Sequence, residues 1–311
     1  MLIFIIVLSV LLLSVFFATL YVYRIAFYTG KKRDDVYDIP PGDQYDPIKA
    51  EMIALVDKLM DIKCEDVYVK AFDGVLLHGR YYHVKDNAPL DIQFHGYRAA
   101  AFRDSCVAGN ASIERGHNLL LVDQRGQGES KSNTMTMGIK EHRDVLTWVE
   151  FSLDKFGKDI KIMLYGLSMG ASSVVMATAL ELPENVKGIL ADCPYSSPTD
   201  IIAFVAKNTT KMPRYVSVPF AALAARVFGG FKLTGFTCKD AVKNAKIPIL
   251  LFHGEADHYV PCYMSEEIKE ANKAMVDRYT FPGAGHGVSY FSDKKRYHDL
   301  LEEFVTRCLN S

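Results

Sequence analysis

Residues 160–180 read IKIMLYGLSMGASSVVMATAL, and this stretch decides the fold. The apolar run IKIMLY leads into Gly166-Leu167-Ser168-Met169-Gly170, and the small and apolar residues that follow favour a helix. Alone, a G-x-S-x-G motif is weak, and a plain helix N-cap serine is the alternative. At a strand-to-helix turn it is typical of a tight turn that holds a serine hydroxyl clear of the sheet. The stretch therefore predicts that Ser168 is a nucleophile.

Short apolar runs recur on both sides of this stretch. Residues 66–84, DVYVKAFDGVLLHGRYYHV, indicate two strands joined at Asp73-Gly74, a good hairpin turn. Further strands are expected at LDIQF (90–94), NLLLVD (118–123), GILAD (188–192), IPILLF (247–252) and RYTF (278–281). Helical patterns separate most of these runs, and such alternation builds a largely parallel sheet. We predict an α/β fold with an eight-stranded, mostly parallel sheet flanked by helices.

A serine hydroxyl is a poor nucleophile until a neighbouring base takes its proton. His286 is the best candidate, because it follows the last apolar run within FPGAGHG, where glycines let the imidazole turn toward the sheet edge. A carboxylate must then hold the imidazole in one tautomer. Asp257 in LFHGEADHYVP is our choice, and the chain order Ser168, Asp257, His286 suits this arrangement. Glu255 and Asp192 also stand at strand ends, so position alone allows all three acids.

Two backbone N–H groups are expected to stabilise the oxyanion that develops during acyl transfer. One belongs to Met169, directly after the nucleophile. The other should come from the loop HGYR after the strand LDIQF, where Gly96 permits a close turn and the Tyr97 N–H is the expected donor. Arg98 is either a surface charge or a substrate contact, and the sequence does not separate these.

The connection between GILAD and IPILLF is too long for an ordinary loop or a single helix. We expect its apolar segment, at about 198–245, to form a small helical cap inserted before the acid-bearing strand. About half of its apolar side chains should pack on the domain. The others can line an acyl pocket, because ligand sites are mostly apolar. We expect Phe220 and Phe228 to contact the substrate.

The N-terminal run MLIFIIVLSVLLLSVFFATLYVY carries no charged side chain. About 20 apolar residues suffice to cross a bilayer as a helix. We expect a single-pass transmembrane anchor at 1–28 rather than a cleaved signal peptide, which has a basic start and a shorter apolar run. Because positive residues tend to remain cytoplasmic, we expect the catalytic domain to face the cytoplasm. The positive residues that follow the span are Arg24, Lys31, Lys32 and Arg33.

The remaining chain divides into two parts. Residues 29–62 should form a polar linker and an amphipathic helix, and packing of that helix on the domain is favoured over a membrane-surface position. Residues 63–311 should form the catalytic domain with its cap. The net charge of −1 argues against a nucleic-acid partner. No metal or phosphate motif is present, so we predict no cofactor and no metal; the sequence gives no indication of the oligomeric state.

Seven segments in chain order carry a resemblance to the α/β-hydrolase superfamily: FDGVLLHGRYY, FHGYR, DQRGQGES, YGLSMG, ADCPYSS, LFHGEADHYVP and GAGHGVSYFSD. From about residue 45 onward, the chain most resembles bacterial membrane-associated members of the group of monoglyceride lipases and serine aminopeptidase-like acyl-peptide hydrolases. The resemblance implies an α/β-hydrolase fold with Asp257 as the triad acid. It also implies that Asp123 and Arg125 are structural residues that pair near the site.

We therefore expect a serine hydrolase that cleaves a carboxylic ester, either an apolar acyl ester or a lysolipid-like molecule, through an acyl-enzyme on Ser168. A serine aminopeptidase or amidase and an acyl-thioesterase are alternatives. The aminopeptidase is less favoured because the cap contains only Asp200 and Asp240 as acids for a free amino group. A catalytically inactive, membrane-tethered interaction protein is the alternative from another class, but such scaffolds usually lose a triad residue.

Overall fold

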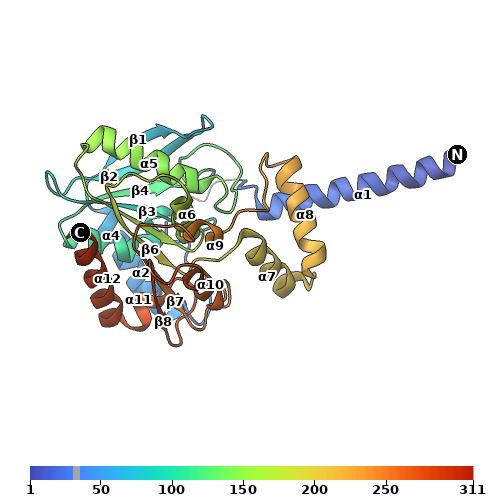
Figure 1. Cartoon of the computed structure of the whole chain (residues 1–311). Helices are drawn as coiled ribbons and strands as arrows, with labels where there is room; N and C mark the ends of the chain where they lie inside the picture. Colours follow the sequence, from blue (N-terminus) through green and yellow to red (C-terminus); the bar gives the residue numbers. More distant parts are fainter. Residues whose placement is uncertain (31–35, 311) are drawn as a thin grey trace.

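Eight strands form one sheet in the order β1-β2-β4-β3-β5-β6-β7-β8 in the computed structural model, which describes residues 1–30 and 36–310 (Figure 1). The β1-β2 and β2-β4 pairs are antiparallel, and the other neighbours are parallel. The predicted eight-stranded, mostly parallel sheet is thereby confirmed. The strands are β1 (Glu65–Lys70), β2 (Leu76–Tyr82), β3 (Leu90–Phe94), β4 (Asn118–Asp123), β5 (Ile162–Leu167), β6 (Val186–Asp192), β7 (Ile249–Gly254) and β8 (Val276–Phe281).

Side chains alternate between the two faces of the sheet, as extended backbone requires. On β5, Ile162 and Leu164 join the main core, whereas Met163 packs in the cluster on the opposite face. Helices cover both faces. The first face carries α5 (Glu141–Phe156), α6 (Met169–Met176), α9 (Cys238–Val242) and α10 (Tyr263–Ala271), and the second α2 (Lys49–Met60), α4 (Cys106–Glu114) and α12 (Lys294–Leu309). Short helical turns complete the domain: η1 (Asp46–Ile48), α3 (Ala101–Asp104), η2 (Ala177–Ala179) and α11 (Ser289–Ser292).

The segment before the first strand packs on the domain. In α2, Met52, Val56 and Leu59 are buried, and Leu59 packs against Gly109 of α4, where an added Cβ would lie 3.0 Å from the leucine side chain. Tyr45 is buried in a cluster that includes Met52. Part of the polar stretch predicted as a linker therefore contributes to the packed domain. Three of the positive residues behind the predicted orientation lie outside the described residues: Lys31, Lys32 and Arg33.

The segment between β6 and β7 contains two helices outside the sheet, α7 (Pro198–Thr210) and α8 (Arg214–Val227). The N-terminal helix α1 (Leu2–Ala26) extends away from the domain, and α8 lies across it (Figure 1). The predicted cap reached residue 245, but α9 near its end belongs to the main core, where Cys238 and Val242 are buried. The part that stands off the sheet is therefore shorter than the sequence indicated.

The expected pairing of Asp123 with Arg125 is wrong. Arg125 donates hydrogen bonds to Asp144 at 2.5 and 2.6 Å and to Asp73 at 2.9 Å. Asp123 instead lies 2.7 Å from the Nδ1 of His78. The two residues are close in sequence, but they bind partners from different elements, because Asp123 ends β4 and Arg125 lies in the loop that follows it.

Candidate active site

Ser168 occupies a sharp turn between β5 and α6. Its backbone has φ 54° and ψ −114°, a conformation that costs energy in any residue with a side chain. The flanking glycines make the turn sterically feasible. An added Cβ would lie 2.4 Å from the carbonyl carbon of Gly170 if placed on Gly166, and 2.0 Å from the carbonyl oxygen of Phe94 if placed on Gly170. The Ser168 side chain is thus held at the carboxyl edge of the parallel strands.

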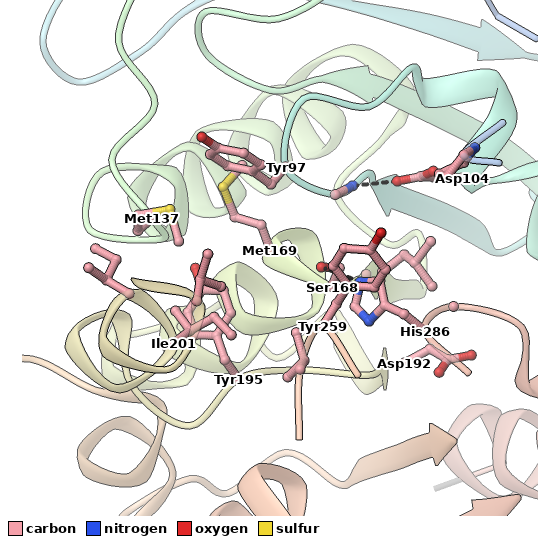
Figure 2. A pocket seen from close by; sticks show the side chains of 18 of the residues that line it. Tyr97, Asp104, Met137, Ser168, Met169, Asp192, Tyr195, Ile201, Tyr259 and His286 are labelled. Atoms are coloured by element: carbon pink, nitrogen blue, oxygen red, sulfur yellow. Dashed lines mark hydrogen bonds between the residues drawn. The ribbon is translucent and has the colours of Figure 1, made fainter. Parts of the chain in front are cut away.

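The structure brings the three residues of the predicted triad together. The Nε2 of His286 lies 3.0 Å from the Oγ of Ser168, and its Nδ1 lies 2.7 Å from the Oδ2 of Asp257 (Figure 2 shows the serine and histidine). With the ring proton on Nδ1, the imidazole donates to the carboxylate and its Nε2 accepts from the serine hydroxyl. This arrangement can remove the serine proton while stabilising the imidazolium that forms.

The alternative acids are placed differently. The Oδ1 of Asp257 accepts the N–H groups of Tyr259 and Val260, both at 2.8 Å, which leaves Oδ2 directed at the histidine. Glu255 is exposed and accepts a hydrogen bond from Thr280 on β8. Asp192 is buried, and its oxygens lie 3.3 Å from the hydroxyls of Ser289 and Tyr297. Only Asp257 among the three candidates contacts the imidazole.

Burial and charge oppose each other in this pair. Burial lowers the pKa of His286, but the charge and hydrogen bond of Asp257 outweigh it and raise the pKa above its usual value. For Asp257, burial raises the pKa, yet the nearby histidines and backbone N–H groups lower it well below the usual range. For Asp192, burial outweighs the nearby histidines and the two hydroxyls, and it raises the pKa to about 6. At neutral pH the carboxylate beside His286 is ionised.

The two backbone N–H groups predicted to stabilise the oxyanion lie on the residue after Ser168 and on the loop after β3. Those of Met169 and Tyr97 donate to no other group among the residues described. By contrast, the N–H of Gly96 donates to the Oδ2 of Asp104 at 2.7 Å (Figure 2). A Cβ on Gly96 would lie 3.3 Å from the Cβ of Ser168, so the loop approaches the serine closely. Asp104, which sequence reasoning missed, thus fixes the loop that carries the Tyr97 amide.

The model of the alpha/beta hydrolase family matches residues 75–300. The chain belongs to this family. The Bacillus subtilis protein YqkD, itself uncharacterized, is 23% identical over 193 residues, which are 62% of this chain and 63% of YqkD, so the chain spans less than two thirds of that relative.

Solved structures show the same fold. An esterase of Pyrococcus furiosus has a TM-score of 0.65 at 23% identity, and the match covers 81% of this chain and 93% of the esterase. An acylaminoacyl peptidase of Pyrococcus horikoshii has a TM-score of 0.58 at 18% identity, covering 82% of this chain and 43% of the peptidase. These neighbours share the fold of this chain and leave its substrate open.

The segment before α2 holds the histidine loop of this hydrolase. The Oε1 of Gln44 accepts the N–H of His286 at 3.1 Å, and the Tyr45 hydroxyl donates to the carbonyl oxygen of the same residue at 2.8 Å. A Cβ on Gly285 would lie 1.3 Å from the Gln44 Oε1, so this contact requires glycine. Both residues fall in a stretch that reads as a polar linker, and no sequence signal identified them.

A cavity of about 710 Å³ opens beside Ser168 and His286. This volume is typical of sites for small organic ligands. Phe220 of α8 lines the cavity together with residues of α1 and α7, so its contact with substrate stays a prediction. Phe228 does not line it, because its ring packs on Phe16 and Tyr23 of α1 with centroids 5.6 and 5.7 Å apart. We therefore withdraw Phe228 as a substrate contact: the position of α1, not the composition of the cap, decides where this ring lies.

The apolar end of the cavity is formed by a cluster that includes Met137, Met169, Tyr195 and Ile201 (Figure 2). Two buried hydroxyls on its lining, those of Tyr195 and Ser217, have no hydrogen-bond partner among the residues described. Buried polar groups are normally paired. Both hydroxyl oxygens are closed off from solvent in this structure, so neither presents a free polar group to the cavity.

One group of side chains in the described chain has the spacing of metal ligands: Cys193, Asp257 and His286 offer atoms within 4.8 Å of one another. Two of these residues already hydrogen-bond to each other, and the Nε2 of His286 faces the Ser168 hydroxyl. Asp257 and His286 thus belong, together with Ser168, to a nucleophile, base and acid series, which explains why these two side chains lie close together.

Proposed function

We propose that this hydrolase is a serine carboxylesterase that cleaves apolar acyl esters through an acyl-enzyme on Ser168. One observation carries the proposal: the continuous hydrogen-bonded series from Ser168 through His286 to Asp257, at the wall of a large, mainly apolar cavity. The family membership and the esterase neighbour support the same reaction class.

The residues would act in sequence. His286 takes the proton of Ser168 as the hydroxyl oxygen attacks the ester carbonyl, and Asp257 stabilises the imidazolium. The N–H groups of Met169 and Tyr97 donate to the resulting oxyanion. His286 then gives its proton to the leaving alcohol, which leaves an acyl group on the serine. Water then attacks the acyl carbonyl while His286 takes a proton from it. His286 returns that proton to the Ser168 oxygen as the bond to the acyl group breaks, which releases the acid and restores the free hydroxyl.

The acids that line the cavity argue against an aminopeptidase. A free amino group would need an unpaired carboxylate, but Asp104 binds the Gly96 N–H and pairs with Arg103. Asp192 is buried against two hydroxyls. In the cap, Asp200 pairs with Arg214, and Asp240 with Lys243. The apolar remainder of the lining suits an acyl chain better.

The test compares the full chain with Ser168→Ala on p-nitrophenyl esters of graded length, acyl thioesters and aminoacyl amides. We expect ester turnover that falls by several orders of magnitude in the variant, because the nucleophile is lost. Labelling by a fluorophosphonate should disappear as well. Preference for aminoacyl amides or thioesters would replace the ester assignment, and absence of labelling in the natural chain would favour an inactive interaction scaffold.

We also propose that α1 is a retained membrane anchor and that the domain faces the cytoplasm. Among the described residues, one helix is long and apolar enough to span a membrane, Leu2–Ala26, and a signal sequence would have the same length and composition. Retention is favoured because Phe27, at its end, is fully buried against Phe231. Membrane fractionation tests the anchor. Protease digestion of the domain from outside spheroplasts would contradict the orientation.

A further inference from the structure

One face of α1 belongs to the lining of the active-site cavity. The five α1 residues on the cavity follow the i, i+3, i+4, i+7 and i+8 spacing of a single helical face. They are Ala18, Tyr21, Val22, Ile25 and Ala26. Tyr21 is 65% exposed and Ile25 49%, although both line the cavity. This wall is therefore also the rim at which the cavity opens outward.

Another face of the same helix is fixed to the cap by aromatic contacts. Phe16 and Tyr23 pack on Phe228, and Phe27 packs edge-on against Phe231 with centroids 5.3 Å apart. Aromatic pairs of this kind stabilise a contact beyond the effect of the apolar area they bury. The contacts hold α1 in one rotational position, with the Ala18–Ala26 face toward the cavity.

The end of α1 is bound to the loop that carries the Tyr97 amide. The last carbonyl groups of a helix lack partners within the helix. Here the Tyr97 hydroxyl donates to the carbonyl oxygens of Ile25 and Ala26, both at 3.1 Å. Arg98 donates to the carbonyls of Ile25 at 3.1 Å and Tyr28 at 2.8 Å. Arg98 is thus neither a free surface charge nor a group directed at substrate.

The length of α1 places this rim at the membrane. The residues before Phe16, 2–15, extend about 21 Å at about 1.5 Å per residue. A bilayer core is about 30 Å thick and needs about 20 apolar residues. A span must therefore continue to about Tyr21, past the first contact with α8. The two cap helices beside α1 also carry exposed apolar side chains: Val205, Tyr215, Leu223 and Val227.

We propose that α1 is a wall of the acyl-binding site, and that the substrate is a bilayer-resident ester whose single acyl chain enters along the Ala18–Ala26 face. This inference rests on the proposed esterase function and the proposed anchor. The ester carbonyl reaches Ser168 while the chain stays in apolar surroundings, between α1 and the cap helices. The chain then passes from hydrocarbon to cavity without exposure of its CH₂ groups to water, and such exposure would be unfavourable for each of them.

The test uses the full-length protein in phosphatidylcholine vesicles, with C4 and C12 p-nitrophenyl esters and with short and long alkyl fluorophosphonates. Val22→Trp fills the cavity from α1, and Val22→Ala removes part of the wall without adding bulk. Leu13→Trp is the matched control, because Leu13 is exposed and does not line the cavity. The readout is the ratio of kcat/KM for C12 to that for C4, together with the corresponding ratio of labelling rates.

We expect Val22→Trp to lower both ratios tenfold or more, Val22→Ala to lower them a few-fold, and Leu13→Trp to leave them unchanged. If both Val22 variants keep the chain-length profile of the natural protein while Ser168 is still labelled, the α1 wall is refuted and the esterase proposal stands. Failure of the natural protein to label at Ser168 would refute the esterase proposal and, with it, this inference.

Discussion

Replacing Tyr45 by phenylalanine removes one hydrogen bond behind the candidate catalytic histidine and keeps the buried ring. The Tyr45 hydroxyl donates to the carbonyl oxygen of His286 at 2.8 Å, and the residue is only 6% exposed. Loss of the hydroxyl leaves a partly buried acceptor unpaired, which costs about 1–3 kcal/mol. If the histidine loop shifts to relieve that cost, kcat falls by about 5- to 150-fold, since about 1.4 kcal/mol corresponds to tenfold.

The assay measures kcat, KM and thermal unfolding of the Tyr45→Phe variant on a short acyl ester. We expect kcat to fall and KM to change little, because Tyr45 acts on the position of His286. Tyr37→Phe is the matched control: it lies in the same segment and loses a surface hydrogen bond to Asp57 of 2.6 Å. A kcat of Tyr45→Phe equal to that of the natural protein, or an equal loss of kcat in Tyr37→Phe, would refute the reasoning.

Two further predictions concern the acid and the pH profile. Asp257→Asn should reduce kcat by orders of magnitude, whereas Glu255→Gln, at an exposed position, should stay near the natural rate; the reverse ranking would show that the acid is misassigned. Because the neutral imidazole is the base and Asp257 raises the pKa of His286, activity should be lost as pH falls through a value above 6.5. The residual kcat/KM of Asp257→Asn should decline at a lower pH than that of the natural protein, and an unchanged acidic limb would contradict this account.

Much of the fold was predictable because its causes are local. The eight strands follow from short apolar runs and turn residues, and each run needs only its own pattern to be recognised. The Ser168 turn was equally local: Gly166 and Gly170 leave no room for a Cβ, so the glycines and the serine must occur together. His286 and three candidate acids could be located because parallel strands bring their carboxyl ends to one edge, and the family resemblance favoured Asp257 among them.

The parts that escaped prediction depend on contacts between distant segments. Gln44 and Tyr45 lie more than 240 positions from His286, and nothing in a polar stretch marks which carbonyl or amide it will bind. Phe228 and Phe220 have the same chemistry and lie on or next to one helix, yet α1 covers the first and leaves the second on the cavity. Whether an apolar side chain of the cap contacts α1 or lines the cavity is decided only when α1 packs against the cap.

Helix α1 shows why composition could not distinguish a helix that spans a membrane from a helix that lines a binding cavity. An α-helix that is apolar on every side carries no pattern that distinguishes lipid from protein neighbours. The face of α1 that lines the cavity differs from its other faces only in side-chain size. Ala18, Val22 and Ala26 recur on it every four residues and leave room beside the helix. The predicted boundary at residue 28 therefore separates parts of the chain that pack together. The end of α1 is buried in a hydrophobic cluster that includes cap residues, and its carbonyl groups accept hydrogen bonds from Tyr97 and Arg98. A chain lacking α1 would lose one side of its cavity together with its proposed anchor.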